Sequence, residues 1–168
     1  KEAIAHHFKF DYKILARRGV QFRCRAFDTM IAHYLIQPES SHKLDRLAET
    51  ELGYATMPIT ELIGKSGKDQ KHMGQLDPAS ITDYACEDAD IAFQLRERLA
   101  PQLEDVASTA LFWDVEMPLA VILADMELEG VRINVPELEK YSVELGTKIE
   151  ELTQAIQEHA GMSFNIDS

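Results

Sequence analysis

A long helical pattern between residues 77 and 100 restricts the folds open to this chain more than any other feature. Asp77 followed by Pro78 is typical of a helix start, because the carboxylate can cap free backbone N–H groups and proline fits the first turn. The residues that follow repeat at intervals of three and four, which places one set on a single helix face: Ile81, Tyr84, Asp88, Ala92, Leu95 and Leu99. A phenol and a carboxylate therefore stand one turn apart on an otherwise apolar face.

Asp88 needs an explanation, because a carboxylate on the buried side of a helix is costly unless it is paired or binds a metal. It could cap a neighbouring element, pair with an arginine, or share a metal ion with a second acid. Asp11 is a candidate for that second acid, since it lies in the apolar and aromatic run FKFDYKIL, residues 8 to 15. Spacing alone leaves Asp11 open as a helix cap, a surface residue or a metal ligand.

The rest of the sequence predicts mostly helices. One strand is predicted over residues 20–26, where Val20, Phe22, Cys24 and Ala26 alternate with polar residues. Asp28 is predicted to cap the helix that Pro38 ends. Further helices are expected over 11–18, 44–52, 118–129 and 135–160, the last one capped by Asn134 and ended by Gly161. The pattern indicates an α-rich α/β fold.

Two of these helices carry apolar faces that predict their packing. On the helix that starts near Pro118 the face consists of Leu119, Ile122, Leu123 and Met126. The last helix has a narrow stripe, which is typical of pairing with another helix: Leu138, Tyr141, Leu145, Ile149, Leu152 and Ile156.

Composition limits the class of protein. With 168 residues and 45% hydrophobic content the chain can bury a core. Cys24 and Cys86 are far apart without a CxxC pair, which favours a reducing compartment, and no apolar run approaches the roughly 20 residues of a membrane span. We expect a soluble intracellular protein.

The net charge is −12, but residues 1–75 hold 12 Lys and Arg against 9 Asp and Glu, so this part could face a polyanion.

Five ordered segments resemble the bacterial DNA polymerase I family: FKFDYKIL, FDTMIAHYLI, HKLDRLAE and YACEDADIAFQL, then VEMPLAVILADMELEGVRIN with FNIDS. The earlier segments are similar to the second and third motifs of its DEDD-type 3′-to-5′ exonuclease. The resemblance implies a partial ribonuclease H-like exonuclease domain over residues 1–113. Residues 114–168 resemble the start of the polymerase domain, with the helices at the base of the thumb.

The resemblance also implies roles for individual residues. Asp11 and Asp88 would be the second- and third-motif ligands of Mg²⁺ or Mn²⁺ in a two-metal site, and Tyr84 would orient the attacking water. Phe10 matches an aromatic position beside the single-stranded 3′ end. His7 stands where relatives commonly have asparagine, and His42 follows Ser41, where some carry arginine near the substrate strand. These two departures affect strand binding rather than the metal chemistry.

The first exonuclease motif, Asp-x-Glu on a strand, belongs before residue 1. We therefore expect the chain to be a fragment that is inactive alone, from a bacterial cytoplasmic DNA polymerase with 3′-to-5′ proofreading. Its partners would be a single-stranded DNA end and, at the thumb, duplex DNA. Asp114-Val115-Glu116 is interpreted as a chance match, since it precedes a helix.

Two other functions stay open. One is a non-catalytic interaction module on a degenerate exonuclease scaffold, and the other is a stand-alone DEDD-type exonuclease. We also expect the chain to self-associate, because the strand at 20–26 has no evident partner strand and would present an unpaired edge.

Overall fold

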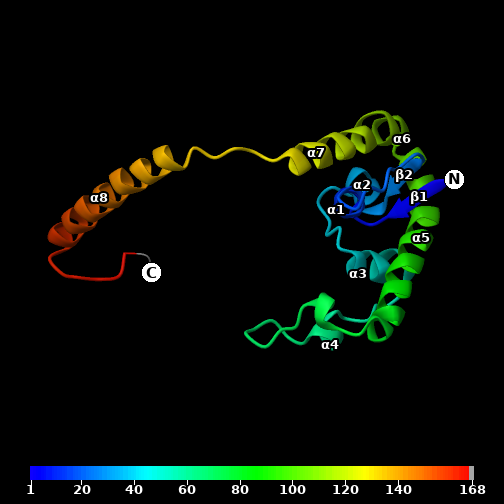
Figure 1. Cartoon of the computed structure of the whole chain (residues 1–168), viewed down its shortest axis with the longest axis horizontal. Coiled ribbons are helices and arrows are strands. Elements are labelled where there is room, and N and C mark those ends of the chain that lie inside the picture. Colours follow the sequence, from blue (N-terminus) through cyan, green and yellow to red (C-terminus); the bar gives the residue numbers. More distant parts are fainter. Residues whose placement is uncertain (167–168) are drawn as a thin grey trace. The chain divides into compact units, whose positions relative to one another are not determined.

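The computed structural model describes residues 1–166 and divides into two compact units, Lys1–Glu129 and Gly130–Ser168. Its fold is α-rich α/β, as the sequence predicts. Figure 1 shows the helices and strands, which follow in chain order: β1 (Glu2–Ala5), α1 (Phe8–Ala16), β2 (Arg25–Asp28), α2 (Thr29–Ile36), α3 (Leu44–Leu47), the π-helical turn η1 (Ala48–Leu52), α4 (Thr60–Ile63), the 3₁₀ turns η2 (Met73–Gln75) and η3 (Pro78–Ile81), α5 (Thr82–Asp105), α6 (Thr109–Leu111), the π-helical turn η4 (Phe112–Glu116), α7 (Met117–Glu129) and α8 (Val135–Ala160).

The sheet is a β-α-β unit rather than the isolated strand that the sequence predicts. β1 and β2 run parallel, with Glu2 opposite Arg25 and Ala5 opposite Asp28, and α1 is the crossover between them. Parallel strands need such a crossover, because a tight turn can join only antiparallel strands. The predicted strand at 20–26 is wrong: the strand begins at Arg25, and it has a partner, β1, that the sequence analysis missed.

The alternating residues 20–24 have another role in this structure. They form irregular chain after Gly19, which has a φ of 80° that favours glycine. Phe22 packs its ring on Phe8 and Tyr12, with ring centroids 5.2 and 5.6 Å apart. Phe22 therefore contacts an aromatic cluster, whereas Val20 and Cys24 are exposed, so the alternation does not correspond to one buried side. Although β1 pairs with β2, the sheet has only these two strands among the described residues and each keeps one unpaired edge, so the expected self-association stays a prediction.

Asp28 is the cap that the sequence predicts, and it also holds a second helix. Its carboxylate accepts the backbone N–H groups of Met30 and Ile31 at the start of α2, at 2.9 and 3.4 Å. The same carboxylate accepts the N–H groups of His7 and Phe8 at the start of α1, at 3.1 and 2.7 Å. Asp28 is 1% exposed. One buried side chain thus fixes two helix starts at the end of β2.

The core of the first unit forms where α5 and the sheet meet. Ala92, Leu95 and Leu99 of α5 are buried, which confirms this part of the predicted apolar face, and Leu103, which was not predicted, is buried as well. Phe27 of β2 packs on Phe112 of η4, with ring centroids 4.8 Å apart. This packing anchors one half of α5 and leaves the half that carries Tyr84 and Asp88 nearer to solvent.

Helix α7 packs through a different face from the predicted one. The buried residues of α7 are Met117, Ala120 and Ala124, whereas the four residues of the predicted face are all exposed: Leu119, Ile122, Leu123 and Met126. The small alanines allow α7 to approach α1 closely. Polar contacts add to this packing: the Tyr12 hydroxyl donates to Asp125, and Lys9 and Lys13 of α1 both pair with Glu127.

The pairing of Glu127 predicts a pH dependence. Lys13 and Lys9 lower the pKa of Glu127 from 4.5 to about 2. Because the pKa is lower in the folded state, the ion pairs stabilise the fold above the unfolded pKa of 4.5, and this contribution is lost as the pH falls toward about 2. We expect Glu127→Gln to lower the melting temperature slightly at pH 7, and the difference to vanish near pH 2. Thermal melts followed by circular dichroism measure it. Glu129→Gln, on the same helix and without a described ion pair, is the control, and an equal effect there would contradict the argument.

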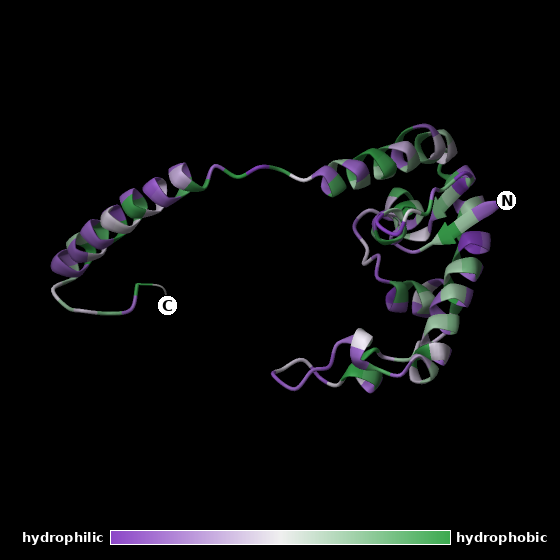
Figure 2. Cartoon of the chain, viewed as in Figure 1, coloured by the Kyte–Doolittle hydropathy of each residue, from purple (hydrophilic) through white to green (hydrophobic). Residues whose placement is uncertain are grey.

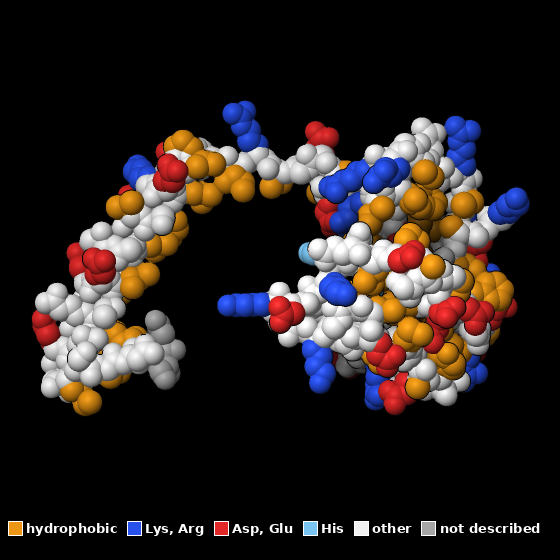
Figure 3. All heavy atoms as spheres, turned by 60° about the horizontal axis from the view of Figure 1, so that its bottom comes forward, with side chains coloured by type: hydrophobic (Ala, Val, Ile, Leu, Met, Phe, Trp, Pro, Cys, Tyr) orange, Lys and Arg blue, Asp and Glu red, His pale blue; other side chains and the backbone are white. Residues whose placement is uncertain are grey.

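In the second unit α8 is one amphipathic helix, as predicted, and ends at Gly161, whose φ is 68°. Asn134 occupies the first capping position, but its side chain makes no capping hydrogen bond. The predicted stripe is exposed along α8, with Leu145 at 41% and Ile149 at 62%. Figure 2 shows hydrophobic and hydrophilic residues alternating along this helix, and Figure 3 shows hydrophobic side chains at its surface.

The last two residues of the FNIDS segment, Asp167 and Ser168, lie outside the described residues. Within residues 1–166, no helix is both long and apolar enough to cross a membrane.

Candidate functional site

Asp11 lies in the first turn of α1 rather than before the helix, and it does not cap that helix, because Asp28 does. Its side chain is exposed and lines a cavity of about 330 Å³ between α1 and β1, together with Ala3 and Ala5. Partial desolvation, followed by the negative charge of Asp28, raises the pKa of Asp11, and His7 opposes this shift. A cation beside Asp11 would favour the ionised carboxylate and so oppose this shift of the pKa.

His7 and Phe10 form an aromatic pair next to Asp11. Their ring centroids are 6.1 Å apart and the planes differ by 29°. Phe10 is 52% exposed. His7 has a φ of 68°, which is uncommon for a residue with a side chain, and Asp28 holds this conformation through the His7 N–H. The exposed ring of Phe10 is available to stack on another planar group.

Tyr84 and Asp88 lie together on α5, as their spacing predicts. They line a cavity of about 420 Å³ with residues of α3 and of the segment 55–59. Desolvation raises the pKa of Asp88, while the hydrogen bond from Tyr84 opposes the shift. Desolvation and the charge of Asp88 raise the pKa of Tyr84, so the phenol stays protonated near neutral pH and can donate a hydrogen bond.

His42 lies apart from Asp11, on the chain that leads into α3. Its Nδ1 atom is 2.7 Å from Nδ1 of the buried His33, and its ring meets Tyr34 edge to face. Desolvation and then the charge of His42 lower the pKa of His33. His42 is therefore held by neighbours from α2, and its backbone lies beside the ring of His6.

Asp11 and Asp88 line different cavities. Among residues 1–166 no group of three or more His, Cys, Asp and Glu side chains could hold a metal ion. The oxygen donors themselves suit Mg²⁺ or Mn²⁺. Asp114-Val115-Glu116 lies in the π-helical turn η4 rather than on a strand, which favours its interpretation as a chance match.

Asp45 is a residue that the sequence analysis missed. It lines the same cavity as Tyr84 and Asp88. Its charge raises the pKa of Tyr84 and acts on His6, the neighbour of His7. Desolvation is the largest cause of both shifts, and Asp45 contributes least to each, so its position in the cavity is the main reason to consider it. A single acid in the short helix LDRL gives no periodic signal that could have identified it.

Comparison with known proteins identifies the family. Residues 1–104 match the 3′–5′ exonuclease family of DNA polymerase A. The chain belongs to this family. The matched residues include Asp11, Tyr84 and Asp88. The 3′–5′ exonuclease family normally depends on divalent metal ions.

The chain is also similar to whole DNA polymerase I proteins. It is 35% identical over 165 residues to DNA polymerase I of Chloroflexus aurantiacus, covering 98% of this chain and 17% of that protein. It is 33% identical to DNA polymerase I of Pseudomonas aeruginosa, covering 100% of this chain and 19% of the relative. The chain thus spans less than a fifth of these curated relatives.

A solved structure shares the fold of this exonuclease-family chain. It is the POL domain of Pol1 from M. smegmatis, in complex with a DNA primer-template and dNTP. The TM-score is 0.76 at 24% identity, and the match covers 98% of this chain and 25% of that one. At this identity the likeness supports the fold alone.

Proposed function

We propose that this chain is part of a bacterial DNA polymerase I that synthesises DNA on a template and proofreads with a two-metal 3′-to-5′ exonuclease. Residues 1–113 would belong to the exonuclease domain, and residues 114–168 would begin the polymerase domain with thumb-base helices. The pairing of Tyr84 with Asp88 carries this proposal, since the family match includes both residues. Action on chromosomal DNA would place the protein in the cytoplasm, at the nucleoid.

Asp11 and Asp88 would hold divalent metal ions in the complete site. Both carboxyls have raised pKa values, so a cation would favour their ionised form. Bound Mg²⁺ or Mn²⁺ would supply charge stabilisation for phosphodiester hydrolysis. The ion would also need ligands beyond these two residues.

Tyr84 would position the attacking water. Its phenolic O–H donates to the Asp88 carboxylate, which holds the ring beside it, and the phenolic oxygen would accept a hydrogen bond from the attacking water. Correct placement of a nucleophile lowers the barrier by removing unproductive orientations. Phe10 and His7 would stack on the unpaired bases of the 3′ end, where an aromatic face suits any base. His42 would contact the strand farther from the reacting phosphate.

The decisive experiment uses a longer protein that includes the upstream part of the exonuclease domain. We expect Asp88→Ala to reduce degradation of single-stranded DNA by about a thousandfold or more, because the ligand that places a metal ion is lost. Tyr84→Phe should cost about tenfold to a hundredfold. Release of nucleotides from a labelled strand measures the rate, and template-directed synthesis should stay unchanged.

Asp90→Ala is the matched control. Asp90 is exposed on the same helix, two residues from Asp88, and accepts a hydrogen bond from Gln94. This variant should keep full exonuclease activity. An Asp88→Ala protein that retains more than about a tenth of the activity would exclude Asp88 as a metal ligand.

A further inference from the structure

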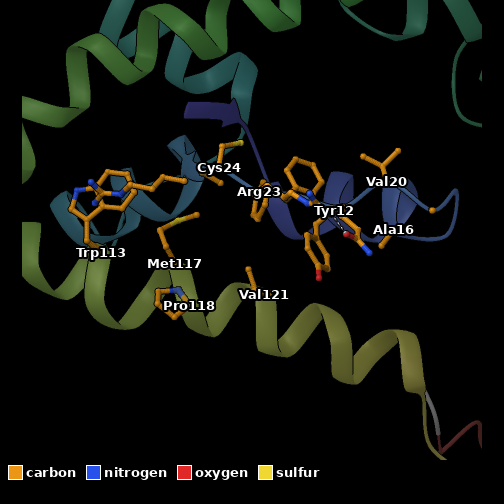
Figure 4. A pocket seen from close by; sticks show the side chains of 15 residues that line it. Tyr12, Ala16, Val20, Arg23, Cys24, Trp113, Met117, Pro118 and Val121 are labelled. Carbon is orange, nitrogen blue, oxygen red and sulfur yellow. Dashed lines mark hydrogen bonds between the residues drawn. The ribbon is translucent and has the colours of Figure 1, made fainter. Parts of the chain in front are cut away.

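A second large cavity lies outside the candidate exonuclease site. It measures about 670 Å³ and opens between α1 and the segment 17–24 on one side and η4 with α7 on the other (Figure 4). We name it the aromatic pocket, after lining residues that include Tyr12, Phe22, Arg23, Arg25, Trp113 and Met117. Neither Asp11 nor Tyr84 nor Asp88 lines it. Its volume is within the range of small-molecule sites.

Planar surfaces line two parts of the aromatic pocket. Tyr12 and Phe22 stack with centroids 5.6 Å apart and planes 27° from parallel. The guanidinium of Arg25 lies 3.8 Å from the centre of the Trp113 ring. Figure 4 shows Met117, Pro118 and Val121 along α7, across from Tyr12 and Arg23. A planar aromatic group in this pocket could therefore stack on planar side chains of the protein.

The charge at the pocket is positive, although the chain as a whole carries −12. Arg23 and Arg25 line the pocket, and Arg17 and Arg18 directly precede the lining residue Gly19. None of these four arginines makes a salt bridge with a carboxylate in the described part of the chain, and Arg23 bonds only the side-chain oxygen of Gln21, at 3.2 Å. The nearby lysines of α1, by contrast, are neutralised by Glu127.

We propose that the aromatic pocket binds a nucleotide, with the base against the rings and the phosphate on Arg23 and Arg25. Aromatic faces combined with arginines are the chemistry that holds unpaired bases and their phosphates. The same chemistry fits a free deoxynucleotide and one unit of a single strand. The pocket is distinct from the proposed metal site, since neither Asp11 nor Asp88 lines it, although Phe8 and Phe22 also line the cavity beside Asp11.

Two probes report on this pocket directly. Trp113 is the one tryptophan of the chain, so stacking of a base beside it should quench the protein's tryptophan fluorescence. Cys24 lines the pocket and Cys86 does not, and both thiols are free and exposed. A bound nucleotide should therefore slow alkylation of Cys24 severalfold while Cys86 reacts at an unchanged rate, as measured by mass spectrometry of the labelled peptides.

The ligands tested are dAMP, dTMP, deoxyadenosine, inorganic phosphate and a short oligothymidylate. We expect dAMP to bind more tightly than deoxyadenosine or phosphate alone, because only dAMP engages both the rings and the arginines. Tighter binding of the oligothymidylate than of dTMP would identify a strand as the ligand, and equal binding would identify the free nucleotide. Failure of dAMP and oligothymidylate to change either Trp113 fluorescence or Cys24 alkylation overturns the proposal, as does equal protection of Cys86.

Substitution of single residues distinguishes binding in this pocket from binding at the exonuclease site. Arg23→Ala should weaken binding about tenfold, since a charge-assisted contact to phosphate is lost. Arg98→Ala removes the same charge from an exposed position on α5 and should leave binding unchanged. Asp88→Ala should also leave it unchanged, so failure of the exonuclease proposal would not affect this result. If Arg23→Ala and Arg98→Ala weaken nucleotide binding equally, the nucleotide is attracted by charge in general, and the proposal that it binds in the aromatic pocket is overturned.

Discussion

Replacement of Asp28 by alanine is expected to destabilise the fold by about 3–5 kcal/mol, because four backbone N–H groups at two helix starts lose their acceptor. The carboxylate accepts from His7 and Phe8 on one side and from Met30 and Ile31 on the other. Water cannot easily replace it, since Asp28 is 1% exposed. Small domains have only about 5–15 kcal/mol of stability in total. Urea unfolding followed by circular dichroism measures the loss.

Two variants test whether the capping itself causes this effect. Asp28→Asn keeps one side-chain oxygen as an acceptor, so its loss should be roughly half that of alanine. Asp77→Ala removes an exposed cap that accepts from Ala79 alone, and should cost about 1 kcal/mol or less. A loss below about 1 kcal/mol for Asp28→Ala would contradict the double-capping role.

The sequence predicts the helices with a strong local signal. The spacing of Leu95 and Leu99 identifies the buried face of α5, and Asp28 before Thr29 identifies the start of α2. These signals work because a helix satisfies its backbone hydrogen bonds within a short segment. The role of Asp28 at α1 could not be predicted in this way, since His7 and Phe8 are about twenty residues away in the chain.

The strands are predicted poorly because their pairing is not local. β1 has only four residues, EAIA, and two of them are alanines, so it carries little strand propensity. Its partner β2 lies across the crossover α1. Of the alternating residues at 20–26, Phe22 packs on Phe8 and Tyr12 while Val20 and Cys24 are exposed, and periodicity alone cannot distinguish this pattern from a sheet face.

The candidate site is predicted in parts for a similar reason. Tyr84 and Asp88 are one helical turn apart, so spacing alone places them together. Asp11 is identified by resemblance, and its distance from Asp88 depends on the packing of two separate elements. Asp45 gives no pattern at all and becomes evident only through its cavity and its effect on the pKa of Tyr84.

The 168-residue chain alone is expected to show no measurable 3′-to-5′ degradation of single-stranded DNA and no nucleotide incorporation, with either Mg²⁺ or Mn²⁺. Asp11 and Asp88 line separate cavities, and a two-metal site needs several carboxylates that converge on both ions. One ion could bind weakly, but the nucleophile would not be placed for in-line attack. Misplacement of this kind costs on the order of a thousandfold or more in rate.

A labelled oligonucleotide incubated with the chain and either metal tests this expectation, and the longer protein that includes the upstream part of the domain is the positive control. If the longer protein trims the oligonucleotide and the 168-residue chain does not, the result agrees with a metal site that further acids complete. Trimming by the 168-residue chain that disappears in its Asp88→Ala variant would instead mean that the described residues hold a sufficient metal site. Asp114 and Glu116 would then have to be tested as ligands, because Asp114-Val115-Glu116 is the chain's literal match to the Asp-x-Glu motif.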